Sequence, residues 1–341
     1  MVKAGMEAVF HHRPPLTGAQ QDGVAEPRVL FGVVSANSSR RDLIRAEFKR
    51  ARPSTGRLLF VVGRGTVETS DDLLHVDVDE FRGSVPLRAN STSSGTISVL
   101  YKLSALLSHA ANSSEQWLVR MDDDVLVNFQ LSIRYAEQLT RHRRVYAGVF
   151  EWYNINMTNL RATGHGYGVE GSRWYGRTFG RCAARFDPTR CVGPFAFAKG
   201  PWALLSRDLI LQVLSSPAFS SVQTAASRIV GKPRHRVHDD ALLGLSVSLV
   251  ANATYVRIPR KKVWLDRTPK TLWPGSLLLA HKPREACYRQ ADRLGVALHR
   301  ERLVQSHHCE PTPPCVDCLH LGSQSTCTLE VRVNVTDEFT C

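Results

Sequence analysis

Short apolar runs alternate with segments of helical periodicity along the first half of the chain. Four of these runs have the length and apolar content of buried strands. They are residues 29–35, 58–63, a weaker run at 74–78, and 117–121. Residues 41–50 and 96–110 instead repeat apolar side chains at the spacing of an amphipathic helix. This order of strands and helices predicts an α/β fold with a mainly parallel central sheet that is covered on both faces.

The second half of the chain is less regular. The apolar spacing predicts helices at 131–144, 204–214 and 241–250, and a further strand at 145–150. Residues 154–188 are rich in Gly, Arg and Tyr and show no period. So long a loop inside a compact domain is usually functional.

Composition divides the chain into three parts. We expect a flexible tail at 1–27, where His, Pro, Gly and Gln are frequent, and one large domain at 28–300. Five of the eight cysteines fall in 301–341, which predicts a small Cys-rich C-terminal appendage.

Three adjacent carboxylates, Asp122, Asp123 and Asp124, follow the apolar run at 117–121 and precede a second apolar segment at 125–127. Burying one unpaired carboxylate is costly, and like charges side by side also repel. A hard divalent cation offsets both costs and often shares its shell with phosphates. The cluster therefore predicts a metal and phosphate site at a strand end, and a solvated acidic turn is the alternative.

The chain is strongly basic, with 44 Lys and Arg against 31 Asp and Glu, a formal charge of +13 and a pI near 9.7. Such a surface attracts anions. The sequence contains no zinc-finger spacing of the DNA-reading type and no aromatic RNA-binding signature, and its arginines are scattered. We therefore expect no nucleic-acid partner, and a solvated basic surface with some residues near a nucleotide diphosphate.

Asparagines and cysteines together indicate a compartment. Six of nine asparagines stand in N-x-Ser/Thr sequons, which is typical of a glycosylated lumenal protein. They are Asn37, Asn90, Asn112, Asn156, Asn252 and Asn334. The first 27 residues hold no apolar run long enough for a signal peptide or anchor, so we expect the full form to carry an anchor that is absent here.

The cysteines allow two interpretations. Cys309, Cys315, Cys318 and Cys327, next to two histidines, have a spacing that a zinc site can use. An even count together with the sequons favours disulfides instead. Cys182 and Cys191 would close a short loop, and the connectivity as a whole stays open.

Six segments in order resemble the inverting β-1,3-galactosyltransferase and N-acetylglucosaminyltransferase family, which includes Fringe. SRRDLIRAEF at 39–48 is similar to R-x-x-I-R-x-T-W, with Glu47 and Phe48 in place of Thr and Trp. The other segments are DDDVLVN at 122–128, RWY at 173–175, GPFAFAKG at 193–200, LSRD at 205–208 and HDDALLG at 238–244. These resemble the family's D-D-D-V-F-V-N, K-W-Y, P-x-Y-x-x-G, L-S-R-D and E-D-V-x-x-G. The resemblance covers about residues 28–290.

The resemblance implies one nucleotide-diphospho-sugar-binding domain (GT-A type, Rossmann-like), a Mn²⁺ cofactor, a UDP-sugar donor, a glycan or glycoprotein acceptor and a Golgi location. Asp124 and His281 would bind the metal, and Asp240 would be the base supported by Asp239. The expected donor-binding residues are Asp122, Asp123, Arg41, Arg45 and Lys102. The expected acceptor-side residues are Trp174, Phe195, Phe197 and Gly200.

Structural alternatives stand beside these roles. Acids at the start of a helix, such as Asp239 and Asp240, also serve as caps. Phe195 and Phe197 also suit core packing, and His281 is compatible with simple exposure. The function that we expect is transfer of galactose or N-acetylglucosamine to a glycan hydroxyl in β-1,3 linkage. A non-catalytic sugar-binding or chaperone-like relative is the alternative, and retention of all these acids favours the enzyme.

Overall fold

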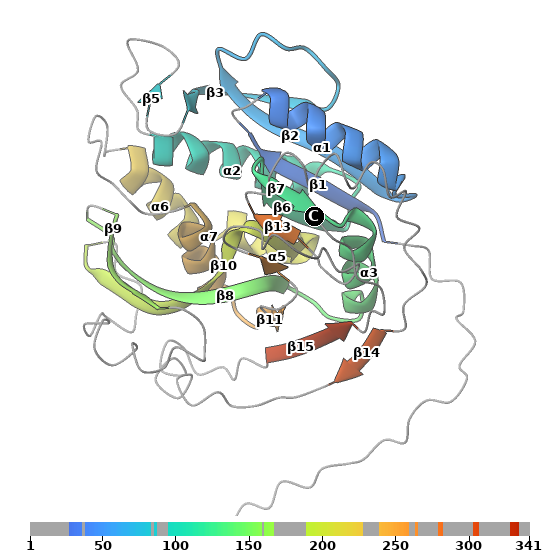
Figure 1. The fold of residues 1–341 in the computed structure, drawn as a ribbon. Helices are drawn as coiled ribbons and strands as arrows, with labels where there is room; N and C mark the ends of the chain where they lie inside the picture. The colour runs from blue at the N-terminus through green and yellow to red at the C-terminus, as the bar shows by residue number, and fades with distance from the viewer. Residues whose placement is uncertain are drawn as a thin grey trace, which may run out of the picture.

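One central sheet organises the fold (Figure 1). The computed structural model describes residues 27–35, 38–82, 85–86, 95–158, 160–166, 189–227, 239–258, 263–264, 279–281, 303–306 and 328–333. Ten strands form this sheet, nine of them in the order β14-β15-β11-β8-β10-β6-β1-β2-β3, and β9 pairs with β8. The fold is therefore α/β with a mostly parallel central sheet, as the sequence predicts.

The predicted strands of the first half are all present and parallel. They are β1 (Val29–Val34), β2 (Gly56–Arg64), β3 (Leu73–Asp79) and β6 (Trp117–Asp122). β1 lies between β2 and β6, with Val34 opposite Val61 on one side and Asp122 on the other. After β1 the chain builds outward through β2 and β3, then returns to the other side of β1 as β6. This reversal of direction occurs between β1 and β6.

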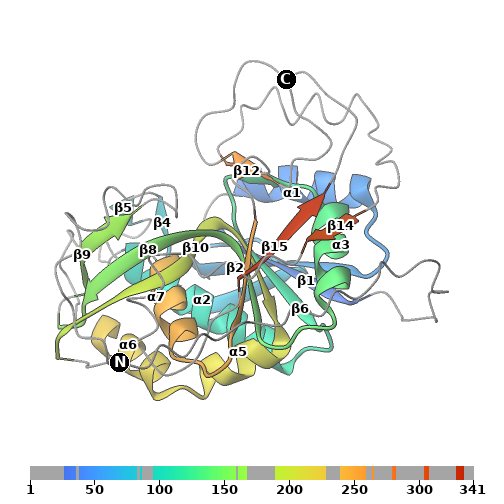
Figure 2. The ribbon, with the colours of Figure 1, turned by 90° about the horizontal axis from the view of Figure 1, so that it is seen from below.

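Helices cover both faces of this sheet (Figure 2). The helices are α1 (Ser38–Ala51), α2 (Gly95–Asn112), α3 (Phe129–Leu139), α5 (Arg207–Leu214), α6 (Pro217–Ser227) and α7 (Asp239–Ser248). Successive strand side chains point to opposite faces. Phe31 therefore packs with α1 and α3, whereas Leu30 packs with α2, α5 and α7. Two of the three apolar cores in the described part result in this way, one on each side of the sheet.

A long antiparallel pair was not predicted. β8 (Val145–Asn156) and β10 (Cys191–Ser206) pair with each other and curve away from the sheet toward β9 (Arg161–Gly166). The prediction of a helix from residue 204 was wrong for its first three residues, which belong to β10. Glycine and proline at 193–194 and 200–201 break the period of two, so pairing with β6 and β8 decides the strand.

The second interruption in β10 is a change of register. β10 is in register with β8 from Phe195 to Ala198 and again from Ala203, and with β6 from Trp202. Lys199, Gly200 and Pro201 fall in this gap, where the backbone is released from the regular ladder. The gap lies beside the end of β6, so it shapes the site described below.

Smaller elements complete the described part. β7 (Val125–Val127) pairs with β13 (Leu279–His281), which pairs with β12 (Val263–Trp264). β4 (Phe81–Arg82) pairs with β5 (Val85–Pro86). β11 (Thr254–Arg257) joins β8 to β15 (Thr328–Val333), and β14 (Leu303–Ser306) forms the edge. The described strands of 301–341 thus extend the main sheet, and the domain boundary at 300 stays a prediction.

Local signals explain where helices begin. The side chain of Asn128 accepts a hydrogen bond from the N–H of Leu131 at 3.0 Å and so caps α3.

None of the described helices has the length and apolar character needed to cross a membrane. Cys191 takes part in a disulfide, and the predicted partner Cys182 lies outside the described residues, as do the other six cysteines.

Candidate functional site

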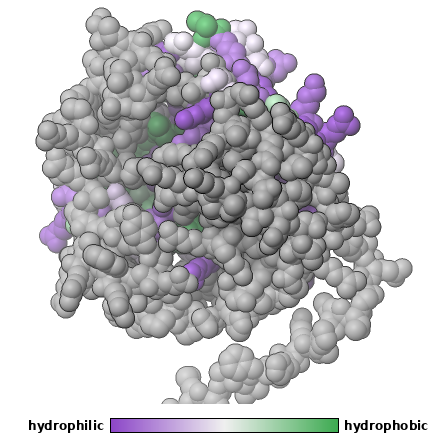
Figure 3. Space-filling model, viewed as in Figure 1, coloured by the Kyte–Doolittle hydropathy of each residue, from purple (hydrophilic) through white to green (hydrophobic). Residues whose placement is uncertain are grey.

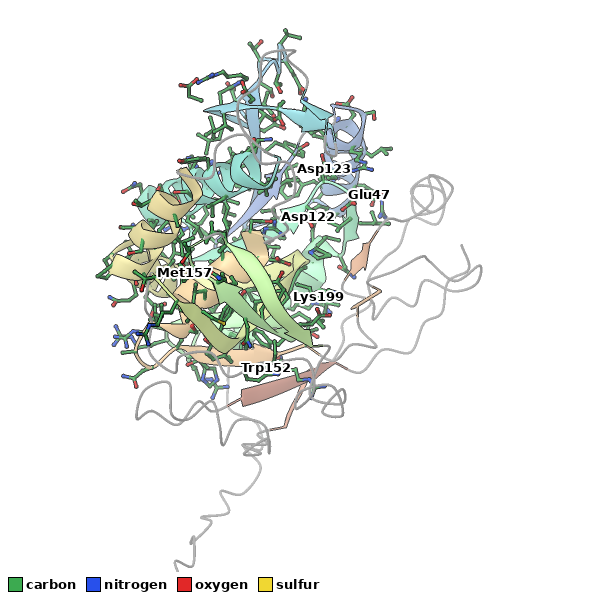
Figure 4. All side chains as sticks on the ribbon, turned by 90° about the vertical axis from the view of Figure 1, so that its left-hand side faces the viewer. Glu47, Asp122, Asp123, Trp152, Met157 and Lys199 are labelled. Atoms are coloured by element: carbon green, nitrogen blue, oxygen red, sulfur yellow. The ribbon has the colours of Figure 1, made fainter. Side chains whose placement is uncertain are left out.

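The acidic cluster lies at the carboxyl end of β6, beside the carboxyl end of β1. Between these two strands the sheet changes its direction of growth, and open α/β sheets bind ligands at this point. In Figure 4 the label of Asp122 lies between those of Glu47, on α1, and Lys199, on β10. The structure therefore places the predicted site where the topology favours one.

Asp123 faces α1. Its carboxylate accepts a hydrogen bond from the hydroxyl of Ser35 at 3.0 Å and pairs with the guanidinium of Arg40 at 3.0 Å. Ser35 directly follows β1, so this contact joins the ends of the two strands at the switch point. Neither Ser35 nor Arg40 was predicted as a site residue, although Arg40 stands next to the predicted Arg41.

Asp122 belongs to a second cluster on the opposite face. Arg120, two residues earlier on β6, pairs with Asp122 at 2.9 Å and with Asp239 at the start of α7. Arg120 is 1% exposed, and the side chain of Asp122 is 32% exposed. The strand end and the helix start, 117 positions apart in sequence (239 − 122), are thus bridged by one guanidinium.

Burial raises the pKa of Asp122 to about 7. The positive charge of Arg120 opposes this rise, and the nearby carboxylates of Asp239, Asp124 and Asp240 increase it. A group of acids this crowded binds cations well, because a cation removes the repulsion that otherwise favours protonation.

Asp240 is held by two backbone donors. The N–H of Gly200 donates to one carboxylate oxygen at 2.7 Å, and the N–H of Ala241 donates to the other at 2.8 Å. A methyl group placed on Gly200 would lie 2.9 Å from a nitrogen of Arg120 and 3.2 Å from oxygens of both Asp122 and Asp240. Gly200 therefore occupies the centre of the cluster, where a side chain does not fit.

The strand pairing brings the two predicted metal ligands toward one another. His281 lies opposite Val125 in the β13–β7 ladder, so its backbone is one position from that of Asp124. Within the described residues no three His, Cys, Asp or Glu side chains form a metal-binding group. Two protein ligands still suit a nucleotide-bound cation, since phosphates and water complete such a shell. The donor types, carboxylate and imidazole, fit Mn²⁺.

The predicted donor-binding arginines of α1 contact carboxylates on the loop after β2. Arg41 donates to Glu68 at 2.7 Å, and Arg45 pairs with Glu68 at 2.5 Å and Asp72 at 2.7 Å. Burial opposes ionisation of Glu68, but the hydrogen bonds from both arginines outweigh it, so the pKa of Glu68 is lowered. Arg41 also donates to the hydroxyl of Ser35 at 3.4 Å, which places it at the rim of the Asp123 cluster.

Lys102 is buried on α2. Its ammonium group contacts both carboxylate oxygens of Glu80, at 2.5 and 2.6 Å, and donates to the carbonyl of Ser35 at 3.0 Å. Burial lowers the pKa of Lys102, and the pair with Glu80 opposes this. In this structure Lys102 fixes the end of β1, and its predicted role in donor binding stays a prediction.

The aromatic residues of β10 belong to the core. Phe195 and Phe197 are 2% and 3% exposed and pack against Tyr153, with ring centroids 6.4 and 5.5 Å apart. This packing is the alternative that the sequence left open for them. Trp174 lies outside the described residues, so its acceptor-side role is not addressed by them.

Arg120 is the central residue that sequence reasoning missed. It interrupts the apolar run Trp117–Met121, and a charge inside a fully buried strand needs a partner. That interruption was the available signal. Its partners on α7 and β10 lie too far away in sequence to be inferred from it.

Comparisons with known proteins add little to this picture. No protein-family model matches the chain, and no curated protein sequence matches it. Solved structures that resemble it include core-mannan synthase A of Aspergillus fumigatus in its Mn/GDP form, at 11% identity and TM-score 0.37, covering 70% of this chain and 74% of that one. Another is the mannosyltransferase Ktr4p of S. cerevisiae in complex with GDP, at 9% identity and TM-score 0.35, covering 67% and 69%.

A third structure is a putative glucose-1-phosphate thymidylyltransferase of Bacillus anthracis, at 8% identity and TM-score 0.32, covering 68% of this chain and 87% of that one. All three TM-scores are below 0.5.

Proposed function

We propose that this chain is a metal-assisted glycosyltransferase that uses a nucleotide-sugar donor. One observation carries the proposal: two acidic groups from distant parts of the sequence, Asp122–Asp124 and Asp239–Asp240, converge at the switch point of a mostly parallel sheet. Such a point binds nucleotides in other α/β folds. If Asp122–Asp124 were only a solvated acidic turn, nothing would require the second acidic pair, Asp239–Asp240, to lie beside it.

The donor side would be formed by the end of β6. Asp124 and His281 are the proposed ligands of Mn²⁺, supported by the β7–β13 register. A bound divalent cation supplies positive charge to the diphosphate as its bond to the sugar breaks. Asp122 and Asp123 would then orient ribose or sugar hydroxyls, or water. Their partners Arg120 and Arg40 keep these carboxylates in place.

The acceptor side would be formed by α7. Inversion requires an acceptor hydroxyl to attack from the face opposite the leaving group, and a positioned base must take its proton. We assign the base to Asp240 and its support to Asp239. Both oxygens of Asp240 receive backbone hydrogen bonds, which fix the orientation of the carboxylate. Its position next to Asp122 across Gly200 supports this role.

The motifs supply the finer part of the proposal. The donor is UDP-galactose or UDP-N-acetylglucosamine, the linkage is β-1,3, and the acceptor is a glycan or glycoprotein. The proposed compartment is the Golgi lumen. Two of the six sequon asparagines, Asn112 and Asn252, are exposed on the described surface, which is compatible with glycosylation there.

The decisive experiment is incubation of the purified chain with a panel of UDP-sugars and Mn²⁺, with release of UDP measured with and without simple glycoside acceptors. We expect acceptor-dependent release from one of the two donors. Asp124→Ala should abolish transfer and weaken Mn²⁺-dependent UDP binding while leaving the protein folded, because it relieves crowding of like charges.

Asp77→Ala is a suitable control for the Asp124 variant. The side chain of Asp77 is 86% exposed on β3 and pairs with the surface residue Arg64. Exposed pairs of this kind add little to stability, so this variant should behave as wild type. If Asp124→Ala transfers sugar as fast as wild type, the assignment of Asp124 as a metal ligand is wrong. If wild-type protein releases no UDP from any donor, the proposed function is wrong.

A further inference from the structure

Arg120 is a fully buried cation at the centre of the site. Along β6, Leu118 packs in the core on the α2–α7 side of the sheet. Alternation places Arg120 and Asp122 on that same face. With 1% of its surface exposed, the guanidinium is covered by protein on every side.

Three elements meet at this guanidinium. One terminal nitrogen donates to the carbonyl of Gly200 on β10. The other donates to Asp239 on α7 and contacts Asp122 on β6 at 2.9 Å. The remaining nitrogen, Nε, is buried and has no hydrogen-bond partner among the described residues. The planar guanidinium group thus joins the end of β6, the irregular part of β10 at Gly200 and the start of α7.

A buried ion cluster is a costly way to hold three elements together. Desolvation of an ion in a protein interior costs several kcal/mol, and apolar side chains of similar volume often stabilise a fold at least as well. Stability alone therefore does not require an arginine here. What the guanidinium provides and an apolar side chain does not is a fixed direction for the carboxylates of Asp122 and Asp239.

The constraint extends to the proposed base. The peptide groups around Gly200 are held from both sides, since its carbonyl accepts from Arg120 and its N–H donates to Asp240. Asp240 also follows Asp239 directly on α7. A displacement of the guanidinium therefore moves Asp240 by two routes, through Gly200 and through the helix.

We propose that Arg120 is a positioning residue that holds the acids of α7 at a fixed distance from the donor-side carboxylates of β6. The proposal rests on the proposed function. Arg120 touches Asp122, Asp239 and Gly200, whereas the proposed metal ligands Asp124 and His281 lie on the neighbouring turn and on β13. Loss of the guanidinium should therefore impair turnover more than donor binding.

The test is Arg120→Lys, which keeps the charge but replaces the fork by a single ammonium group that does not reproduce its geometry. We expect kcat to fall by about 10²-fold, the cost typical of a small misplacement of catalytic groups. The affinity for UDP with Mn²⁺, which depends on the proposed ligands Asp124 and His281, should stay within about threefold of wild type. Arg57→Lys is the control, since Arg57 pairs with the buried Glu115 near the other end of β6, away from the acidic cluster.

Amide hydrogen exchange measures the same constraint without any substrate. In Arg120→Lys the amides of Gly200 and Ala241, which donate to Asp240, should exchange at least about tenfold faster than in wild type. The amides of the β1–β2 ladder should be unchanged, which reports that the domain remains folded.

The outcomes separate the two proposals. Unchanged exchange at Gly200 and Ala241 would overturn the inference, because Arg120 would then not hold α7. Faster exchange with unchanged kcat would also overturn it, leaving a purely structural brace. Wild-type protein that releases no UDP from any donor would contradict the proposed function instead, whatever the exchange rates are.

Discussion

Asp240 has the geometry of a helix cap and is the proposed base, whereas a second aspartate in the same fold has the cap geometry without a proposed catalytic role. Asp208 at the start of α5 accepts from the N–H of Leu209 at 3.0 Å and from the N–H of Arg144 at 2.9 Å. Asp240 accepts from Ala241 and Gly200 in the same pattern. Asp208 lies near the start of β6, away from the acidic cluster at its end. Variants of Asp240 and Asp208 therefore allow the capping role and the proposed catalytic role to be measured separately.

We expect Asp240→Asn and Asp208→Asn to lose similar stability and very different activity. An amide has one acceptor oxygen, so each variant leaves a backbone N–H facing an NH₂ group, at a cost of about 1 kcal/mol. Turnover of Asp240→Asn should fall by about 10²–10⁴-fold, as is typical of a lost general base. Measured kcat and Tm for both variants decide this, and near-normal turnover in Asp240→Asn would move the base elsewhere.

Gly200→Ala should inactivate the site through crowding. Its methyl group would lie 2.9 Å from a nitrogen of Arg120, which cannot move without disturbing its carboxylate partners. Overpacking of this kind costs about 1–3 kcal/mol, and here the displaced groups are the proposed site residues. We expect kcat to be reduced at least tenfold.

Gly65→Ala provides the comparison for this variant. A methyl group on Gly65 meets no atom within 4 Å, but its φ of 98° is unfavourable for alanine, so stability falls without any contact to the site. Equal losses of kcat in both glycine variants would mean that the effect comes from stability and not from crowding of the cluster.

At the scale of elements, strand ends are joined by ion pairs in which the arginine is partly exposed. Arg57 near the start of β2 donates to Glu115 before β6 at 2.6 Å, and Arg45 of α1 joins Asp72 before β3 at 2.7 Å. Hydrophilic residues accordingly gather on the described surface over α1 (Figure 3). These contacts orient neighbouring elements, and their strength depends on protonation of the acids.

The Glu115 pair predicts a pH dependence of stability. Burial would raise the pKa of Glu115, but hydrogen bonds from Arg57 and Ser113 outweigh it and lower the pKa to about 2. Because the folded pKa is below the ordinary value of 4.5, the contribution is present above that value and is lost as pH falls toward 2. Glu115→Gln should therefore reduce the free energy of unfolding at pH 7 by about 1 kcal/mol, after screening at the exposed arginine.

The measurement is urea unfolding of Glu115→Gln and wild type between pH 7 and pH 3. The difference in free energy should shrink as pH falls below 4.5. Glu137→Gln, at an exposed position of α3, should differ little from wild type at any pH. A Glu115→Gln deficit that is the same at pH 7 and pH 3 would show that the ion pair is not its source.

For the molecule as a whole, the sequence predicts contiguous features well and contacts between distant segments poorly. β1 is a continuous apolar run, and β6 is apolar except for Arg120 up to its acidic end, so their burial and the position of the acids follow from local pattern. β10 was missed because two Gly-Pro interruptions hide its period, and only pairing with β6 and β8 makes it a strand. Arg120 was missed for the same reason, since its partners come from β10 and α7.

The same limit applies to individual site residues. Phe195 and Phe197 were placed at the acceptor side through motif resemblance, whereas their packing against Tyr153 depends on the β8–β10 register. His281 is the converse case. Its backbone lies opposite Val125 in the short β7–β13 pairing, which no periodicity in the sequence indicates, and this pairing supports its proposed role as a metal ligand. Motif order therefore predicts candidate site residues, and tertiary pairing decides which of them lie close together.

The last prediction concerns the whole molecule and its compartment. A chain expressed through a secretory pathway should shift in gel mobility when N-glycans are removed, and should show no free thiols while folded. Asn112→Gln and Asn252→Gln should each reduce that shift, because both asparagines are exposed in the structure. Asn128→Gln would test capping and not glycosylation, since Asn128 caps α3 and stands in no sequon. No mobility shift together with eight reactive thiols would argue for a reducing compartment and would revive a zinc site at Cys309–Cys327.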